Sequence, residues 1–370
     1  MRYFKIAFLL VALSLAIGSC TVSKTNMNWL LIDFNKIHGE TRLNNIFDAL
    51  SKYQFNQFLI LNKNHFILLG DNSKDSNPDY SAKTIEAVVF VSADGGKTLK
   101  KHVLGNGSIS EAVSAGNVIF AVNELDKDRG SSQLIKSDPL FERWEIVSEF
   151  AHSDINNINF YSPSIGVASF LTEDDNNDFT TAIQYTLDGG KTWLPTKLEV
   201  ADGFGTYVFL SQQEIGFIEN NHVVKFNFLT NQKTVLDQPV APDGYHCEGN
   251  YFKDPVTLAL YTYIENLDTK EVSVKNLTTE AITLLPKGSD HLEIYGSYFH
   301  TLVKDGSYTN YVWSNDKGQN WHTEEIRDFF VMPVPQGFYG KGYVFAVVAL
   351  FKGKDTDKGG RLAIRRPGSW

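Results

Sequence analysis

Three short segments of the chain repeat one pattern and restrict its fold more than any other feature. They are SADGGKTL (92–99), TLDGGKTW (186–193) and SNDKGQNW (314–321), and they align without gaps. Ser or Thr stands first, Asp third, Gly fifth, and Leu or Trp eighth. β-rich sequence (AVVFV, TAIQY or TNYVW) precedes each segment, so each is predicted to be the turn of a β-hairpin. We call these three segments the repeat turns.

The spacing of the pattern predicts many more strands than three hairpins supply. SDPLFERW (137–144) keeps the first and eighth positions but not the Asp and the Gly, and weaker copies lie at 228–235, 265–272 and 355–362. Between these turns, further segments read as strand, polar turn, strand: 58–70, 115–123, 158–170, 207–219, 249–261, 293–303 and 336–348. Four strands in about 45 residues are typical of a β-propeller blade. We therefore predict an all-β propeller of four-stranded blades, with seven blades and with six or eight as alternatives.

The repeated pattern resembles the Asp-box, also called the bacterial neuraminidase repeat. That motif occurs in sialidases, sortilin-type receptors, some xyloglucanases and photosystem assembly factors, and the resemblance covers most of residues 55–370. It implies that the box Asp lies on the outer hairpin of a blade and is structural. The physical chemistry agrees, because an Asp can accept N–H bonds within its own turn and a Gly permits positive φ. The predicted structural positions are Ser92, Asp94, Gly96, Thr98, Thr186, Asp188, Gly190, Thr192, Trp193, Ser314, Asp316, Gly318 and Trp321.

The N-terminus predicts export and lipidation. Arg2 and Lys5 precede an apolar run at 6–17 that is too short for a good membrane-spanning helix, and small residues follow it. The segment IGSC (17–20) resembles the lipobox of bacterial lipoproteins, which implies lipidation of Cys20. We therefore predict a signal peptide at 1–19, and a segment at 20–54 with a closing strand (NWLLIDF, 28–34) and a short helix (42–53). The propeller then occupies 55–370.

Composition argues against several classes of ligand. The chain has a formal net charge of -9, so it lacks the clustered basic residues that nucleic-acid binding needs. The repeat turns do not match a phosphate-binding loop, because Val91 and Tyr185 stand where its first Gly would be. At 355–360, DTDKGG resembles half of a calcium loop, but Arg366 replaces the final Glu. We assign no metal and no cofactor, and no role to the adjacent His246 and Cys247.

A sialidase is the main enzymatic alternative. That family needs three arginines around the substrate carboxylate, a Tyr–Glu nucleophile pair and an Asp acid/base, and its Arg-Ile-Pro motif is missing here. Tyr261, Tyr263 and Glu265 have the right side chains, but their spacing also suits an ordinary strand. Four arginines are scattered along the chain (Arg42, Arg129, Arg143 and Arg327), and Arg361, Arg365 and Arg366 lie together near its end.

We therefore expect no catalytic residues and a function in binding. The expected protein is a lipid-anchored, monomeric propeller of the bacterial cell envelope, on an outer membrane and facing the periplasm or the exterior. Its expected partner is a protein, either in envelope assembly or as a toxin neutralised by an immunity lipoprotein of type VI secretion. The alternative is a sialidase-like glycoside hydrolase or a glycan-binding propeller.

Overall fold

The computed structural model describes twelve stretches of the chain: 29–32, 37–38, 53–73, 85–126, 131–151, 153–173, 179–199, 206–305, 308–326, 329–331, 337–350 and 360–367. Every regular element in these stretches is a β-strand. The predicted signal peptide (1–19), Cys20 and all of the predicted helix except Tyr53 lie outside the described residues. Within the described part, no helix has the length and hydropathy needed to cross a bilayer.

The first half of the chain forms one five-stranded and one eight-stranded sheet. The first sheet contains β3 (Gln54–Asn62), β4 (His65–Asp71), β5 (Glu86–Ser92), β6 (Leu99–Asn106) and, parallel to β6, the short β2 (Ile37–His38). The second contains β7 (Ser108–Ala115), β8 (Val118–Asp126), β9 (Ser131–Ser137), β10 (Trp144–Phe150), β11 (Ser153–Phe160), β12 (Gly166–Glu173), β13 (Phe179–Thr186) and β14 (Leu194–Glu199). A single parallel pair, Ser153 with Ser131, joins its two four-stranded halves.

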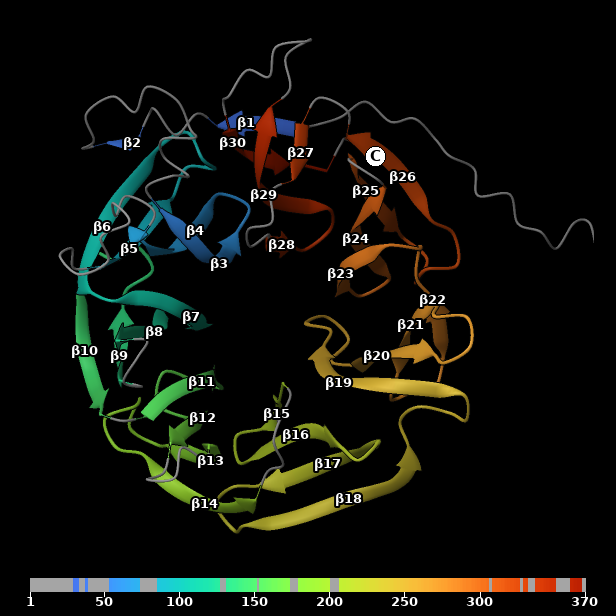
Figure 1. Ribbon diagram of the computed structural model, residues 1–370, viewed down its shortest axis with the longest axis horizontal. Helices are drawn as coiled ribbons and strands as arrows, with labels where there is room; N and C mark the ends of the chain where they lie inside the picture. Colours follow the sequence, from blue (N-terminus) through green and yellow to red (C-terminus); the bar gives the residue numbers. More distant parts are fainter. Residues whose placement is uncertain are drawn as a thin grey trace, which may run out of the picture.

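The second half of the chain forms four more sheets. The next two contain β15 (Val208–Ser211), β16 (Glu214–Glu219), β17 (His222–Asn227) and β18 (Gln232–Pro239), then β19 (Tyr245–Lys253), β20 (Leu260–Asn266), β21 (Val272–Asn276) and β22 (Ile282–Leu284). The last two contain β23 (Ser289–Tyr295), β24 (Tyr298–Asp305), β25 (Tyr308–Ser314) and β26 (His322–Ile326), then β27 (Phe329–Val331), β28 (Gly337–Tyr339), β29 (Tyr343–Leu350), β30 (Gly360–Arg365) and β1 (Trp29–Ile32). Figure 1 shows all these sheets arranged around a common centre.

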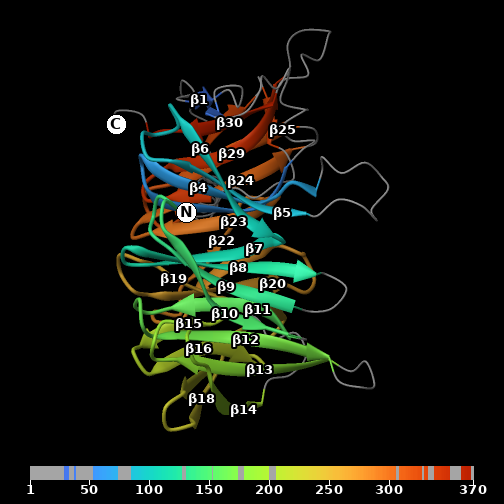
Figure 2. The same cartoon turned by 90° about the vertical axis from the view of Figure 1, so that its left-hand side faces the viewer.

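The antiparallel order of the strands gives the ring two distinct faces. Turns between the first and second strands of a four-stranded unit lie at the same end as turns between its third and fourth strands. The three repeat turns are of the latter kind, since they join β5 to β6, β13 to β14 and β25 to β26. We call the face that carries all these turns the repeat-turn face. Figure 2 shows the strands side-on, running between this face and the opposite one.

Strand β1 brings the N-terminal part of the chain to the last sheet. It pairs antiparallel with β30, and Trp29 stands opposite Arg365. Residues 29–32 therefore form the strand that follows β30 at the outer edge of the last sheet. Because a ring with an unpaired last sheet would expose a long edge, this pairing protects β30.

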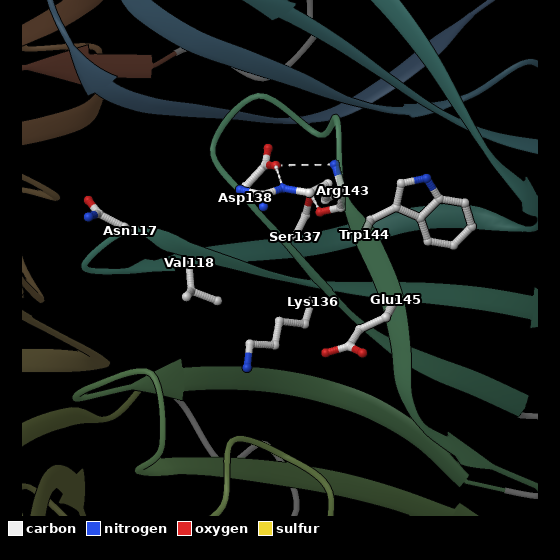
Figure 3. Close-up of a pocket in the computed structure, with 8 residues that line it drawn as sticks. All are labelled: Asn117, Val118, Lys136, Ser137, Asp138, Arg143, Trp144 and Glu145. Atoms are coloured by element: carbon white, nitrogen blue, oxygen red, sulfur yellow. Dashed lines mark hydrogen bonds and ion pairs between the residues drawn. The ribbon is translucent and has the colours of Figure 1, made fainter.

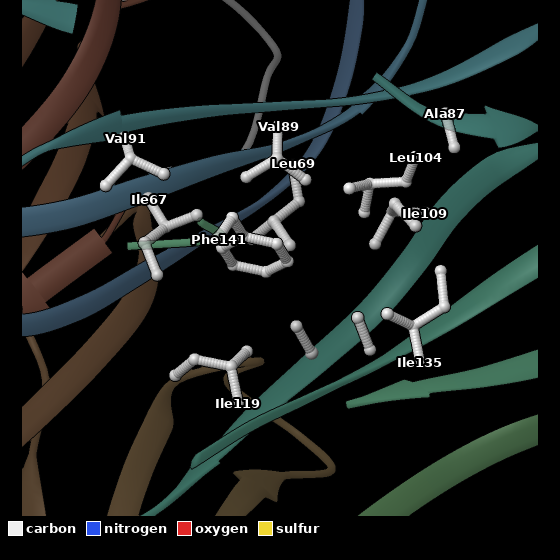
Figure 4. Packing of buried hydrophobic residues seen from close by; sticks show 12 residues of the cluster. Ile67, Leu69, Ala87, Val89, Val91, Leu104, Ile109, Ile119, Ile135 and Phe141 are labelled. Atoms are coloured by element: carbon white, nitrogen blue, oxygen red, sulfur yellow. The ribbon is translucent and has the colours of Figure 1, made fainter. Parts of the chain in front are cut away.

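The core consists of separate apolar clusters between neighbouring sheets. Inner strands such as β4 and β5 bury side chains on both faces of their sheet, since the sheet packs against two others, whereas the outer strand β18 is exposed along its whole length. Figure 4 shows the cluster between the first sheet and β7–β10, where Ile67 and Val89 pack against Ile119 and Ile135. Similar clusters lie around the ring, for example that of Tyr298, Trp313 and Val344 between the last two sheets.

Two of the weaker copies of the repeat turn do not connect the third and fourth strands of a four-stranded unit, so these two predictions are wrong. Residues 265–272 connect β20 to β21, which are the second and third strands of their sheet, and the outer turn there is 277–281. Likewise, 355–362 leads into β30 from β29, and the structure describes only its last three residues. The sequence pattern could not distinguish these turns from those between the third and fourth strands, because every turn of a four-stranded meander has polar residues flanked by β-forming residues.

Candidate functional site

The repeat turns form nearly identical hydrogen-bond networks. In the first, Ser92 Oγ accepts a bond from the Gly96 amide at 2.8 Å and donates to Asp94 at 3.0 Å. The amide and hydroxyl of Thr98 both donate to Asp94, at 3.0 and 2.7 Å. The other two turns repeat these bonds with Thr186, Asp188, Gly190 and Thr192, and with Ser314, Asp316, Gly318 and Asn320.

These bonds keep the three carboxyl groups ionised. The pKa of Asp188 is lowered to about 2, chiefly because the Thr192 amide and hydroxyl donate to its carboxylate. The pKa of Asp94 and Asp316 is also lowered, because hydrogen bonds within the turn outweigh the upward effect of partial burial. A carboxylate in this state is a poor proton donor near neutral pH. These Asp carboxylates therefore stabilise their own turns through hydrogen bonds.

The fifth position of each repeat turn is a glycine in the left-handed region, and in two of the turns a tryptophan ring lies against it. The φ angles of Gly96, Gly190 and Gly318 are 85°, 89° and 80°. A Cβ built on Gly190 would lie 3.7 Å from the Trp193 ring, and one built on Gly318 would lie 3.1 Å from the Trp321 ring. In these two turns the eighth residue thus covers the glycine.

The related turn at 137–144 reaches the same shape with different residues. Asp138, one position earlier than in the repeat turns, accepts bonds from the amides of Leu140, Glu142 and Arg143. Phe141 occupies the fifth position with a φ of 52°, although it is not a glycine. Its side chain is buried in the cluster of Figure 4. The repeat pattern in the sequence predicts this turn, but it does not indicate Asp138 as the acceptor, because Asp138 stands one position earlier than the Asp of the other turns.

The exchange of Gly for Phe141 changes the position of the tryptophan that follows. Trp193 packs against Phe150, Phe160 and Phe170, with ring centroids 5.5 to 6.5 Å apart. Trp144, at the equivalent position, is 38% exposed instead. Because Phe141 fills the core itself, there is no open glycine surface for the Trp144 ring to cover.

A pocket of about 340 Å³ lies beside this turn. It is lined by Asn117, Val118, Lys136, Ser137, Asp138, Arg143, Trp144 and Glu145. In Figure 3, Lys136 and Glu145 project on one side of the sheet, whereas the Trp144 ring points away from them. Arg143 is paired with Asp138 at 3.3 Å, yet 90% of its side chain is exposed. The loss of the glycine beside a retained tryptophan was the sequence signal that could have singled out this site.

The residues considered for a sialidase serve the packing of the sheets. Tyr263 donates to the Leu292 carbonyl oxygen and accepts from the Leu292 amide in the neighbouring sheet, and Tyr261 is buried. Glu265 is paired with Lys270 at 3.3 Å. The three side chains alternate along β20, so they share one face of that strand.

The arginines near the end of β30 do not converge on one site. Arg365 is buried and donates to Glu324 through Nε and Nη2, at 3.1 and 2.8 Å. It also lies over the Tyr311 ring, 4.0 Å from the centroid. Arg366 instead donates to the Gly95 carbonyl oxygen in the first sheet. The two side chains thus tie the last sheet to both of its neighbours. Arg42, Arg129 and Arg327 lie outside the described residues.

Glu111 is the carboxyl group with the most unusual environment near the centre of the ring. It lies on β7 and accepts a bond from the Ile158 amide on β11, at 2.8 Å. Burial raises its pKa to about 7. Other side chains also link the innermost strands, such as Gln57, whose amide group pairs with the backbone of Ala112. Glu111 belongs to this set of links between the innermost strands.

The described residues offer no cluster of three or more His, Cys, Asp or Glu side chains that could hold a metal ion. Cys247 is a free thiol whose sulfur lies 3.5 Å from the Thr262 hydroxyl. Its neighbour His246, also on β19, is exposed. The DTDKGG segment lies outside the described residues except for its last glycine.

Comparison with known proteins finds similarity in structure. No family model matches the chain, and no curated protein matches its sequence. YCF48 from Cyanidioschyzon merolae has a TM-score of 0.52 and 13% identity, and the match covers 92% of this chain and 99% of that one. The β-propeller domain of the Trilobed protease from Pyrococcus furiosus has a TM-score of 0.57 and 8% identity, covering 85% and 94%. Acylaminoacyl peptidase from Pyrococcus horikoshii has a TM-score of 0.56 and 9% identity, and covers 84% of this chain but 50% of its own.

The ring of antiparallel sheets and these matches define the chain as a β-propeller. At identities of 8 to 13%, the similarity extends to the fold alone.

Proposed function

We propose that this chain is a lipid-anchored, non-enzymatic, seven-bladed propeller that binds a protein partner in the bacterial cell envelope. Seven blades follow if each half of the eight-stranded sheet counts as one blade, since a single pair joins the halves. Cys20 is the proposed point of lipidation, and the Asp-box resemblance assigns the repeat turns to the scaffold. The proposed partner acts in envelope assembly or is a toxin that the propeller neutralises.

The surface around Trp144 carries this proposal. Leu140, Trp144 and Ile146 are 38%, 38% and 43% exposed, and Arg143 is still more exposed. We call these four residues the Trp144 surface. Tryptophan and arginine are enriched among the residues that dominate binding energy at protein interfaces. The same pattern position is partly covered by aromatic neighbours at Trp193, so the exposure of Trp144 distinguishes the unit β7–β10 from the unit β11–β14.

The positions of the candidate catalytic side chains support a role without chemistry. Asp94, Asp188 and Asp316 bind their own turns, and Tyr263 binds the neighbouring sheet. Arg365 is paired with the buried Glu324, so its guanidinium already has a carboxylate partner within the protein. We propose that none of these groups acts on a substrate.

The test is cross-linking in intact cells with the tagged full-length protein. We expect the wild type to capture one protein reproducibly and the double variant Trp144→Ala, Ile146→Ala to lose most of that capture. Leu194→Ala is the matched control, because Leu194 begins β14, as Trp144 begins β10, and is 42% exposed. Its capture should equal that of the wild type.

Three results would count against the proposal. Equal capture by all three proteins would remove the Trp144 surface as the binding site. Turnover of a fluorogenic sialoside, abolished by Tyr261→Phe or Tyr263→Phe, would replace the non-enzymatic role with the glycoside hydrolase alternative. Binding to a glycan array without any cross-linked protein would favour the glycan-binding alternative.

A further inference from the structure

We propose that the repeat-turn face of the propeller lies against the lipid bilayer in which the chain is anchored. This inference rests on the proposed lipidation of Cys20. It adds an orientation and a second, apolar point of contact with the membrane. Leu140 and Arg143 of the Trp144 surface lie in a turn of this same face, so a partner would reach that surface from the perimeter of the ring, along the outer strand β10.

The chain enters the propeller at the repeat-turn face. β30 is the third strand of its sheet, so its C-terminal end lies at that face. Trp29, the first residue of β1, pairs with Arg365 at this end. The neighbouring Arg366 independently marks the same face, because it donates to Gly95 in the first repeat turn. A tether from Cys20 therefore reaches the propeller from the repeat-turn side.

The length of the tether restricts the orientation further. Eight residues, 21–28, separate Cys20 from Trp29. Fully extended, such a segment spans at most about 30 Å. An eight-residue strand such as β24 is about 26 Å long, which approximates the thickness of the ring. If the opposite face lay on the membrane, the tether would need nearly its whole length to pass from one face of the ring to the other.

Exposed apolar side chains are placed on the repeat-turn face far from the tether. Val256 and Leu258 are 52% and 61% exposed at the tip of the β19–β20 turn. Leu229, Leu187 and Tyr161 are 38%, 47% and 47% exposed in other turns of the same face. These residues belong to three consecutive four-stranded units, β11–β14, β15–β18 and β19–β22. Figure 1 shows these units across the ring from β1, so tether and apolar tips together would hold the face flat on a bilayer.

The turn that carries Val256 and Leu258 is built to keep its backbone satisfied away from water. The buried carboxylate of Asp254 accepts the amides of Val256 and Thr257, and also that of Gly296 in the next sheet. The Leu258 amide donates to the Asp254 carbonyl oxygen at 2.9 Å. Unpaired backbone amides are the main free-energy cost of placing a loop in an apolar medium. Because the amides of this turn are paired, its entry into the interfacial region of the bilayer costs little free energy.

Charge on the repeat-turn face is compatible with an anionic lipid surface, although the whole chain is acidic. Exposed lysines stand on its turns: Lys63, Lys97, Lys191, Lys317 and Lys341. The Asp residues of the three repeat turns direct their oxygens to their own amides and hydroxyls. Lysines near an anionic membrane contribute favourable energy that falls off within a Debye length.

The test compares two residues of one sheet that lie on opposite faces. Leu258 is on the repeat-turn face, whereas Leu267, in the β20–β21 turn, is 51% exposed on the other. In a Cys247→Ser background, the lipidated full-length protein would carry Leu258→Cys or Leu267→Cys labelled with an environment-sensitive fluorophore. It would be reconstituted on vesicles of phosphatidylethanolamine and phosphatidylglycerol containing spin-labelled phosphatidylcholine. We expect quenching of the Leu258 label severalfold above that of the Leu267 label.

Flotation of the vesicles separates this inference from the anchor itself. If the protein floats but the two labels are quenched equally, or Leu267 more, or neither, the orientation is overturned and the anchor stands. If the protein fails to float and contains no acylated Cys20, the anchor and the orientation both fail. A Cys247→Ser protein labelled at neither turn reports background quenching.

Discussion

Asp188 and Glu111 show how neighbouring donors decide the charge of a carboxyl group in this molecule. Asp188 is exposed, but Thr192 and Thr186 donate three hydrogen bonds to its oxygens, which favours the charged form. Glu111 is half-buried and accepts one amide, so the loss of water outweighs the single bond and favours the neutral form. Position in sequence could not distinguish these two cases, because the donor to Glu111 lies 47 residues away, in the other four-stranded half of its sheet.

Replacing Asp188 with Ala should lower the free energy of unfolding by about 1–2 kcal/mol, since amide and hydroxyl donors of the turn lose their acceptor. Because the folded pKa of Asp188 is lowered to about 2, its contribution is present above the ordinary Asp pKa of 3.8 and is lost as the pH falls through about 2. Urea unfolding of wild type and variant at neutral and acidic pH measures both effects. Lys191→Ala, in the same turn, is the control. If Asp188→Ala is as stable as Lys191→Ala, the hydrogen bonds to Asp188 do not stabilise the turn.

Replacing Glu111 with Gln should remove a pH dependence of stability. The folded pKa of Glu111 is raised from 4.5 to about 7, so the wild type should lose stability as the pH rises through this interval. The loss is at most about 3 kcal/mol. Gln keeps an acceptor for the Ile158 amide without titrating. Unfolding midpoints at pH 5 and pH 8 should converge in the variant, whereas those of an exposed-site control, Glu145→Gln, should differ as in the wild type.

At the scale of single elements, four turns achieve one geometry with two sets of residues. Three use a glycine in the left-handed region, and the turn at 137–144 uses Phe141 and shifts its carboxylate acceptor to Asp138. The consequence extends to the next strand, because Trp144 is exposed at the start of β10. Propensity alone predicted the hairpins, but the direction of this tryptophan depends on what fills the space between two sheets.

Gly190→Ala should be destabilising by about 2–4 kcal/mol, because a Cβ would lie 2.4 Å from the buried Leu134 side chain and the φ of 89° disfavours any L side chain. Gly105→Ala is the matched control. Gly105 has a φ of 111°, but nothing lies within 4 Å of its Cβ position. It should incur only the backbone penalty. If thermal unfolding shows equal losses for both variants, packing against Leu134 is not what requires glycine at position 190.

At the scale of the whole molecule, the two ends of the chain are joined through the last sheet. β1 pairs with β30, Arg365 is paired with Glu324 in the preceding sheet, and Arg366 binds the first repeat turn. Glu324 is buried, so loss of its partner Arg365 would leave an unpaired charge inside the protein, which is energetically costly. The last sheet therefore depends on contacts that are more than 200 residues apart in sequence, as Arg366 and Gly95 are 271 apart.

Deleting Trp29–Ile32 should lower the free energy of unfolding by about 3 kcal/mol or more, because the packing of Trp29 is lost and β30 becomes an edge. Deleting residues 22–25, which shortens the tether by the same amount, should leave the unfolding transition unchanged. Differential scanning calorimetry of both variants distinguishes closure from simple shortening. Equal transitions would mean that β1 is dispensable for the ring.

Local periodicity was enough to predict an all-β fold of many antiparallel strands and the three repeat turns, because turn chemistry and alternation depend on neighbouring residues. It failed at 265–272 and 355–362, where the role of a turn depends on its place in a sheet. Tertiary structure alone decided which carboxyl groups are ionised, why Trp144 is exposed, and at which face of the ring β1 begins. Those properties arise from burial and from partners on other sheets, and a linear pattern carries no record of either.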